Sequence, residues 1–183
     1  MFDRPTYPLQ FVQCNRLKDE SGNLPTFIYK FFSPRTRLIY IVRVECLREN
    51  LFALKFYCKK DRKSDRKYQK LTNRGDVSAI LKTCLSVLPE MLQQFPESSF
   101  CFIASRSLDQ YNHLREAMAA NQRFRVYREF INQMVGEERF THVVNEAVSG
   151  YLLLNNCNQQ PENKIAEIKT WLAYTYPDLG DLT

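Results

Sequence analysis

The side chains best suited to binding chemistry in this sequence are the lysines and arginines between positions 55 and 74. This segment carries nine Lys or Arg and two Asp, a net charge of +7, whereas the other 163 residues carry 17 basic and 18 acidic side chains. Clustered positive charge produces a local potential that recruits polyanions. We therefore expect the segment to contact nucleic-acid phosphates, which gives affinity without sequence preference.

The same segment also fits a plain solvated loop, because lysines at a hairpin tip keep a sheet edge from pairing with other chains. Asp61 and Asp65 dilute its charge, as on an ordinary surface. Tyr57 and Tyr68 could stack on the bases of a single strand, but a half-buried strand position is the expectation for Tyr57. The candidate phosphate-binding residues of the segment are Lys59, Lys60, Arg62, Lys63, Arg66, Lys67, Lys70 and Arg74.

Three further arginines, Arg123, Arg125 and Arg128, lie close together in Q-R-F-R-V-Y-R-E-F. On a helix Arg125 and Arg128 share a face, and Glu129 lies four residues after Arg125, so a local ion pair worth ~0.3–0.5 kcal/mol is one interpretation. The other is an anion clamp, since guanidinium groups bind phosphate oxygens in a forked geometry. If this helix lies near the basic segment, the three arginines extend its surface.

The residues available for catalysis are few. His113 lies near Glu116 on an expected helix, but an acid–base pair needs a third group that the sequence does not identify. Cys101 could act as a nucleophile with His142, although a cysteine between apolar strand residues usually has a raised pKa and is inert. A small metal-independent nuclease that uses His113 or His142 is therefore an alternative, and no catalytic residue is assigned.

The composition favours one folded domain over residues 1–183 and excludes several classes of site. The six cysteines include no C-x-x-C pair and have no histidine near them in sequence, so neither structural zinc nor another metal site is expected. Only five glycines are present, which argues against a Gly-rich phosphate loop, and no cofactor is expected. No apolar run approaches the ~20 residues of a membrane span, and the N-terminus lacks a signal-peptide pattern. We expect a cytoplasmic protein without membrane contact.

Alternating apolar residues predict an antiparallel meander of three strands in the first third of the chain. The strands are expected over 26–32, 37–46 and 51–58. The residues before about position 23 show little periodicity and are expected to be irregular.

A helical pattern from Val77 to Phe95 follows the basic segment. Asn73 or Asp76 is the expected N-cap. Because Pro89 lies inside the pattern, a kink or short break is expected near Ser86.

Later elements complete an α+β domain whose largely antiparallel sheet has helices packed on one face. Strands are expected over 99–104, 139–144 and 150–155. Helices are expected over 108–120, 122–135 and 162–174.

Five short stretches carry a further set of motifs: D-V-S-A-I-L-K-T-C (76–84), S-F-C-F-I (99–103), R-F-R-V-Y-R (123–128), F-T-H (140–142) and S-G-Y-L-L-L-N (149–155). Together they resemble a group of small bacterial α+β proteins that has no established activity. The resemblance implies a single α+β domain and adds no catalytic residues. The chain has Ala104 where the group leads us to expect glycine, which disfavours close backbone approach to a ligand there.

The leading hypothesis is a non-enzymatic binding module that contacts nucleic-acid phosphates through the basic segment. The first alternative is a protein-interaction subunit, in which the segment docks on an acidic protein partner or the chain forms a homo-oligomer, for example in a toxin–antitoxin or phage-defence system. The nuclease is the second alternative.

Overall fold

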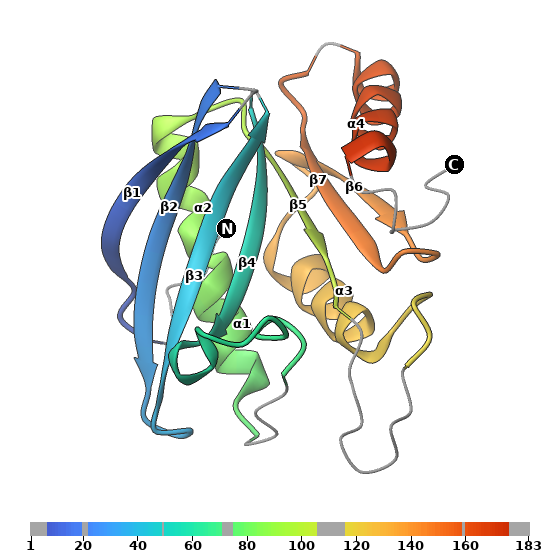
Figure 1. The fold of residues 1–183 in the computed structure, drawn as a ribbon. Coiled ribbons are helices and arrows are strands. Elements are labelled where there is room, and N and C mark those ends of the chain that lie inside the picture. The colour runs from blue at the N-terminus through green and yellow to red at the C-terminus, as the bar shows by residue number, and fades with distance from the viewer. Residues whose placement is uncertain are drawn as a thin grey trace. The chain divides into compact units, whose positions relative to one another are not determined.

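The computed structural model describes residues 7–19, 22–48, 50–70, 75–105, 116–158 and 160–175. The chain divides into two compact units, Met1–Ser98 and Ser99–Thr183 (Figure 1). Each unit combines strands with helices, and the strand pairs described within them are antiparallel, which confirms the α+β class. The prediction of a single domain stays a prediction. Among the described residues no helix has both the length and the apolar character to cross a membrane.

The first unit contains a meander of four strands in the order β1-β2-β3-β4. Their bounds are β1 Gln10–Asp19, β2 Gly22–Ser33, β3 Leu38–Arg48 and β4 Leu51–Cys58. The three predicted strands correspond to β2, β3 and β4. The expectation of an irregular N-terminus to about residue 23 is wrong, because β1 pairs with β2 from Gln10 opposite Lys30 to Asp19 opposite Gly22. The ladder to β2 supplies the hydrogen bonds of this strand, and a bulge between Phe11 and Gln13 interrupts its alternation.

Two helices, α1 (Val77–Leu85) and α2 (Val87–Gln94), belong to the first unit and are separated at Ser86, which confirms the predicted break. They lie on one face of the meander: the Tyr29 hydroxyl donates to Glu90 Oε1 at 3.0 Å, and the rings of Phe27 and Phe95 meet edge to face at 5.7 Å. Tyr29 is fully buried in this core.

Asp76 occupies the N-cap position of α1, but its side chain makes no capping hydrogen bond. Its carboxylate instead accepts from the Tyr7 hydroxyl at 2.9 and 3.0 Å and from the Ser33 hydroxyl at 2.5 Å. Burial and the Asp76 carboxylate raise the pKa of Tyr7. The predicted capping role is therefore replaced by a buried link between the N-terminal segment, the end of β2 and the start of α1.

The second unit has three strands in the order β5-β7-β6 and two helices. Their bounds are β5 Ser99–Ile103, β6 Phe140–Asn145, β7 Gly150–Asn155, α3 Gln122–Met134 and α4 Pro161–Thr175. The Phe102 ring meets Tyr127 of α3 edge to face at 6.0 Å. On the opposite face Cys101 and Val143 line a small apolar pocket with Ile168 of α4. Helices therefore cover both faces of this small sheet, whereas those of the first unit lie on one face, as predicted.

The prediction of a helix over residues 108–120 is wrong for residues 116–120, its described part, which are not helical. Residues 106–115 lie outside the described ranges, and residues 116–120 form bends and turns. Helix α3 starts instead after Asn121, whose side-chain oxygen accepts from the backbone N–H of Phe124 at 2.9 Å. This is a true N-cap, which satisfies one of the free backbone N–H groups at the start of α3.

Candidate nucleic-acid interface

The basic segment folds after β4 into a short 3-10 helix, η1 (Lys59–Asp61), and a series of turns to residue 70, which we call the basic loop (residues 59–70). Backbone N–H groups donate to the carbonyl three residues earlier at 2.9–3.1 Å, from Arg62, Ser64, Lys67 and Gln69. Asp61 is 8% exposed and accepts from Lys70 Nζ at 2.8 Å. This aspartate therefore ties the two ends of the loop together, and it offsets the charge of Lys70.

Two tyrosines and a lysine fix the loop on the sheet. The ring of Tyr57, on β4, meets that of Tyr68 edge to face at 5.4 Å, and Lys67 Nζ lies 5.2 and 5.3 Å from the two ring centres. Such cation–π contacts stabilise a structure by about 0.5–1 kcal/mol at exposed sites. Tyr57 is buried, as expected for a strand residue, and burial raises the pKa of Tyr68 to about 12. The Tyr68 phenol therefore stays neutral near pH 7.

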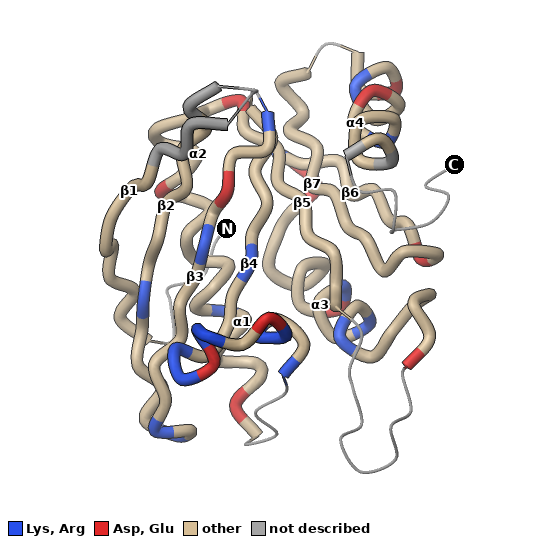
Figure 2. The backbone as a smooth tube through the Cα atoms, viewed as in Figure 1, with Lys and Arg blue, Asp and Glu red and all other residues tan. Residues whose placement is uncertain are grey.

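Figure 2 shows the backbone positions of the remaining cations of the basic loop gathered where the loop crosses in front of β3 and β4. All five are exposed and take part in no ion pair within the described ranges: Lys59, Lys60, Arg62, Lys63 and Arg66. Asp65 is exposed beside them. Arg74, also predicted as a phosphate ligand, lies outside the described residues.

The three arginines of the second cluster belong to α3, in the second unit. Arg123 is 8% exposed, and burial lowers the pKa of its guanidinium group. Arg128 donates to Glu146 at 2.6 Å and lies 5.6 Å from the centre of the Phe124 ring. Arg125 is exposed, and the expected ion pair with Glu129 does not form. Only Arg125 of the three therefore presents a guanidinium group that is both exposed and unpaired among described residues.

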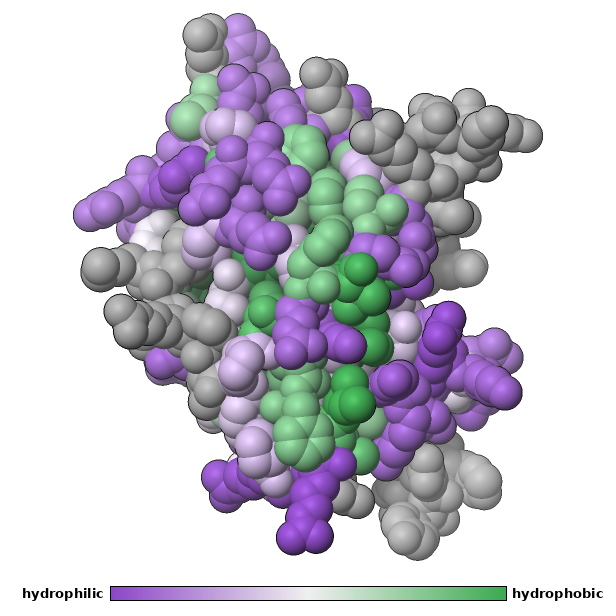
Figure 3. Space-filling view, turned by 90° about the vertical axis from the view of Figure 1, so that its left-hand side faces the viewer, coloured by the Kyte–Doolittle hydropathy of each residue, from purple (hydrophilic) through white to green (hydrophobic). Residues whose placement is uncertain are grey.

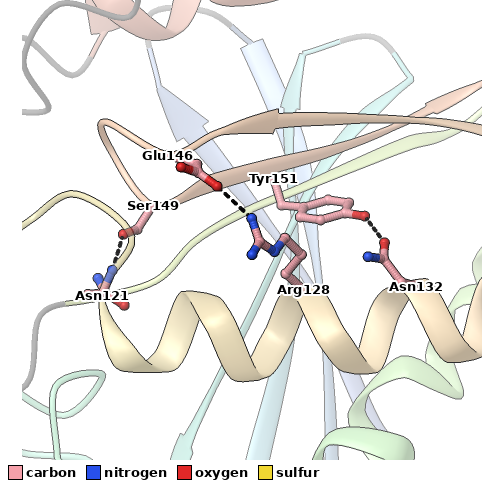
Figure 4. Close-up of polar contacts among 6 residues, drawn as sticks. All are labelled: Asn121, Arg128, Asn132, Glu146, Ser149 and Tyr151. Carbon is pink, nitrogen blue, oxygen red and sulfur yellow. Dashed lines mark hydrogen bonds and ion pairs between the residues drawn. The ribbon is translucent and has the colours of Figure 1, made fainter.

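Figure 4 shows why Arg128 has a structural role. Polar links join α3 to the β6–β7 hairpin along its length: Asn121 N–H to Ser149 Oγ at 3.0 Å, Arg128 to Glu146, and the Tyr151 hydroxyl to Asn132 Oδ1 at 2.6 Å. The arginine fills the middle position of this row.

His142 is linked to the same row through Tyr151. The Tyr151 hydroxyl donates to Asn132, so its oxygen accepts from His142 Nδ1–H at 2.6 Å, and the buried Nε2 makes no hydrogen bond to a described residue. Burial lowers the pKa of His142 and outweighs the Glu137 carboxylate, which raises it. Burial raises the pKa of Tyr151 to about 12. This geometry suits a neutral packing histidine.

The proposed pairing of Cys101 with His142 is wrong. In the register of β5, β7 and β6, Cys101 lies opposite Leu152 and His142 lies opposite Leu153. Consecutive residues of a strand point to opposite faces of a sheet, so the two side chains lie on different sides. Cys101 faces the α4 side, and His142 faces the α3 side with Tyr151. His113, the other candidate, lies outside the described residues, and the nuclease alternative stays a prediction.

Acid should destabilise the second unit through His142. Its folded-state pKa is lower than the ordinary value of 6.5, so the unfolded chain takes up a proton first and stability falls as the pH drops through 6.5. The slope stays below the ~1.4 kcal/mol per pH unit of one fully coupled proton, because the ring is partly solvated. Urea midpoints between about pH 5 and pH 7 should fall less for His142→Phe than for the wild type. Equal slopes would contradict this origin.

The β1 edge of the first unit carries apolar surface that the sequence does not reveal. Phe11 and Val12 are 54% and 44% exposed, and Figure 3, which faces this edge, shows an apolar band between hydrophilic borders. A groove beneath β1 is lined by Phe11, Cys14, Pro25, Phe27, Glu90, Gln94 and Phe95. This surface was missed because an irregular N-terminus was expected from the sequence. Only a strand places these side chains on a common face.

Within the described ranges, no group of three or more His, Cys, Asp or Glu side chains is placed to hold a metal ion. No protein-family model matches the chain, and no curated protein or solved structure matches it either. The function is therefore inferred from the charges and contacts of the chain itself.

Proposed function

We propose that this protein binds nucleic acid through phosphate contacts made by the basic loop. The observation that carries the proposal is the set of five exposed cations without ion pairs, held on a loop with its own hydrogen bonds and an anchored base. Each lysine or arginine that neutralises a phosphate releases a condensed counterion, and this release drives sequence-independent binding.

The fixed shape of the basic loop favours binding because less conformational entropy is lost when it meets a ligand. Asp61, Lys67 and Lys70 make contacts that hold the loop in place, and the other five cations remain exposed to solvent. An acidic protein could bind the same charges. A nucleic acid is favoured because its phosphates recur along the whole strand and can meet several cations at once.

Binding should weaken steeply as salt rises. Five phosphate contacts predict a log–log slope of about −3.5 on a single strand or about −4.5 on a duplex. Between about 50 and 200 mM NaCl the affinity for a single strand should fall on the order of 100-fold. Fluorescence anisotropy of labelled single-stranded and duplex DNA and RNA over this range measures the slope.

An affinity that does not change with salt concentration would contradict the proposal, and so would the absence of binding at the lowest salt concentration. In the second case the basic loop is a solvated surface, and an acidic protein partner becomes the next ligand to test.

A further inference from the structure

The face of the meander that α1 and α2 leave uncovered has a regular pattern of side chains. Phe27, Tyr29 and Phe31 of β2 are buried toward the helices, so Lys30 and Phe32 point to the other side. Lys30 is exposed, and Phe32 is 51% exposed. A large aromatic side chain thus lies in solvent on an open sheet face, beside a lysine.

The strand register places this phenylalanine next to the basic loop. Phe32 of β2 lies opposite Ile39 of β3, and Tyr40, the next residue of β3, lies opposite Cys58, the last residue of β4. Lys59, which opens the loop, follows Cys58 directly and therefore starts beside the row that contains Phe32 and Ile39. Neighbouring strands lie about 4.8 Å apart, so Phe32 and the start of the loop are separated by about 10 Å.

The basic loop itself folds onto this open face. Tyr57 points to the face, because it lies opposite Ile41, which lies opposite Lys30. Tyr68 of the loop packs on Tyr57, and the charges of Arg43 and Glu45, which share the face, act on the Tyr68 phenol. One continuous surface therefore carries an exposed ring, an apolar row and the unpaired cations.

We propose that this open face binds single-stranded nucleic acid, with an unpaired base stacked on Phe32 and the adjoining phosphates held by the basic loop. The inference rests on the proposed function and adds its substrate class. In a duplex the faces of the bases are covered by their neighbours, and a ring on a flat sheet cannot reach them. In a single strand each base has a free face, and stacking on an aromatic ring tolerates any sequence.

The charge of the surface favours this ligand over a protein. An apolar protein partner would have to bury Lys30 and the neighbouring loop cations, at a high cost in lost hydration. A single strand offers flat apolar bases and phosphates in alternation, which matches an aromatic ring beside exposed cations.

The test compares Phe32→Ala with Phe11→Ala, a matched control. Phe11 is 54% exposed, but it points to the helix side of the sheet, where its ring meets Tyr29 at 5.4 Å. With a short labelled oligothymidylate, Phe32→Ala should lower the affinity by about 5- to 150-fold, and Phe11→Ala by less than about 2-fold. With a duplex, both variants should bind like the wild type.

A second variant reports the stacking directly through its fluorescence, so the measurement does not depend on a change in affinity. In Phe32→Trp, on a Trp171→Phe background, the indole emission should be quenched when oligothymidylate binds and remain unchanged with the duplex. Unchanged oligothymidylate binding by Phe32→Ala, or equal losses on both ligands, would overturn the inference. If reversing the charges of the basic loop still abolished binding in the same assay, the proposed function would stand. If neither Phe32→Ala nor the charge reversal weakened binding, the inference and the proposed function would both fail.

Discussion

Reversing three charges of the basic loop, in a variant with Lys60→Glu, Lys63→Glu and Arg66→Glu, should weaken nucleic-acid binding at least about 100-fold at low salt. Each basic side chain near a polyanionic surface contributes on the order of 1 kcal/mol, so the loss of three contacts alone predicts this change. The introduced glutamates add repulsion. The log–log salt slope should also flatten by about 2 on a single strand, because three fewer counterions are released.

The three positions are chosen because all are exposed and none forms an ion pair with a described residue. Lys67 and Lys70 are left intact, since they hold the loop against Tyr57 and Asp61 and their loss could unfold it. The variant should therefore keep the thermal stability of the wild type within about 0.5 kcal/mol, the usual range for surface substitutions.

A control with the same change in net charge separates the loop from the overall charge of the chain. Arg139→Glu, Lys164→Glu and Lys169→Glu place the three reversals on exposed or partly exposed residues of the second unit. None of these three residues is a proposed phosphate ligand, and only cations that contact phosphates release counterions, so this variant should bind within about 3-fold of the wild type. Equal losses in the two variants would assign the binding to net charge, and no loss in the loop variant would contradict the proposed function.

The elements predicted correctly are those whose signal is local in the sequence. The alternation around β3 needs no partner to be recognised, because its buried residues Tyr40, Val42 and Val44 recur at a period of two. The break at Ser86 follows from Pro89 alone. Strand β1 lacked such a signal, because its sequence Q-F-V-Q-C-N-R-L-K-D is mostly polar and its pairing depends on β2.

The basic segment was recognised from its charge, but its shape depends on contacts that composition does not encode. Asp61 looks like an ordinary surface charge in the sequence, but in the fold it is buried and pairs with Lys70, nine residues later. Cys101 and His142 look like a plausible pair until the strand register places them on opposite faces. The open face with Phe32 likewise exists only once four strands are aligned side by side.

Asp76 is the clearest case of a correct position with a different role. Its place before an apolar helical run predicts a cap, and it does stand at the N-cap of α1. The carboxylate is 5% exposed and is held by the hydroxyls of Tyr7 and Ser33, which lie 69 and 43 residues away in sequence. A local rule cannot predict a partner at such separations.

Asp76→Ala should therefore lower the free energy of unfolding by about 2–4 kcal/mol, more than the ~1 kcal/mol typical of a lost cap. The larger cost arises because hydrogen bonds to a charged group contribute about 1.5–3 kcal/mol each and two hydroxyl donors lose their acceptor together. Urea unfolding followed by circular dichroism measures the change.

Asp76→Ser distinguishes the two roles, because serine is as good an N-cap as aspartate but lacks the second oxygen that the two hydroxyls share. If Asp76 acts through Tyr7 and Ser33, the serine variant should stay within about 1 kcal/mol of Asp76→Ala. Ser33→Ala should then cost much less in the Asp76→Ala background than in the wild type, since the shared hydrogen bond is already lost. A serine variant as stable as the wild type would restore the capping role and contradict the buried link.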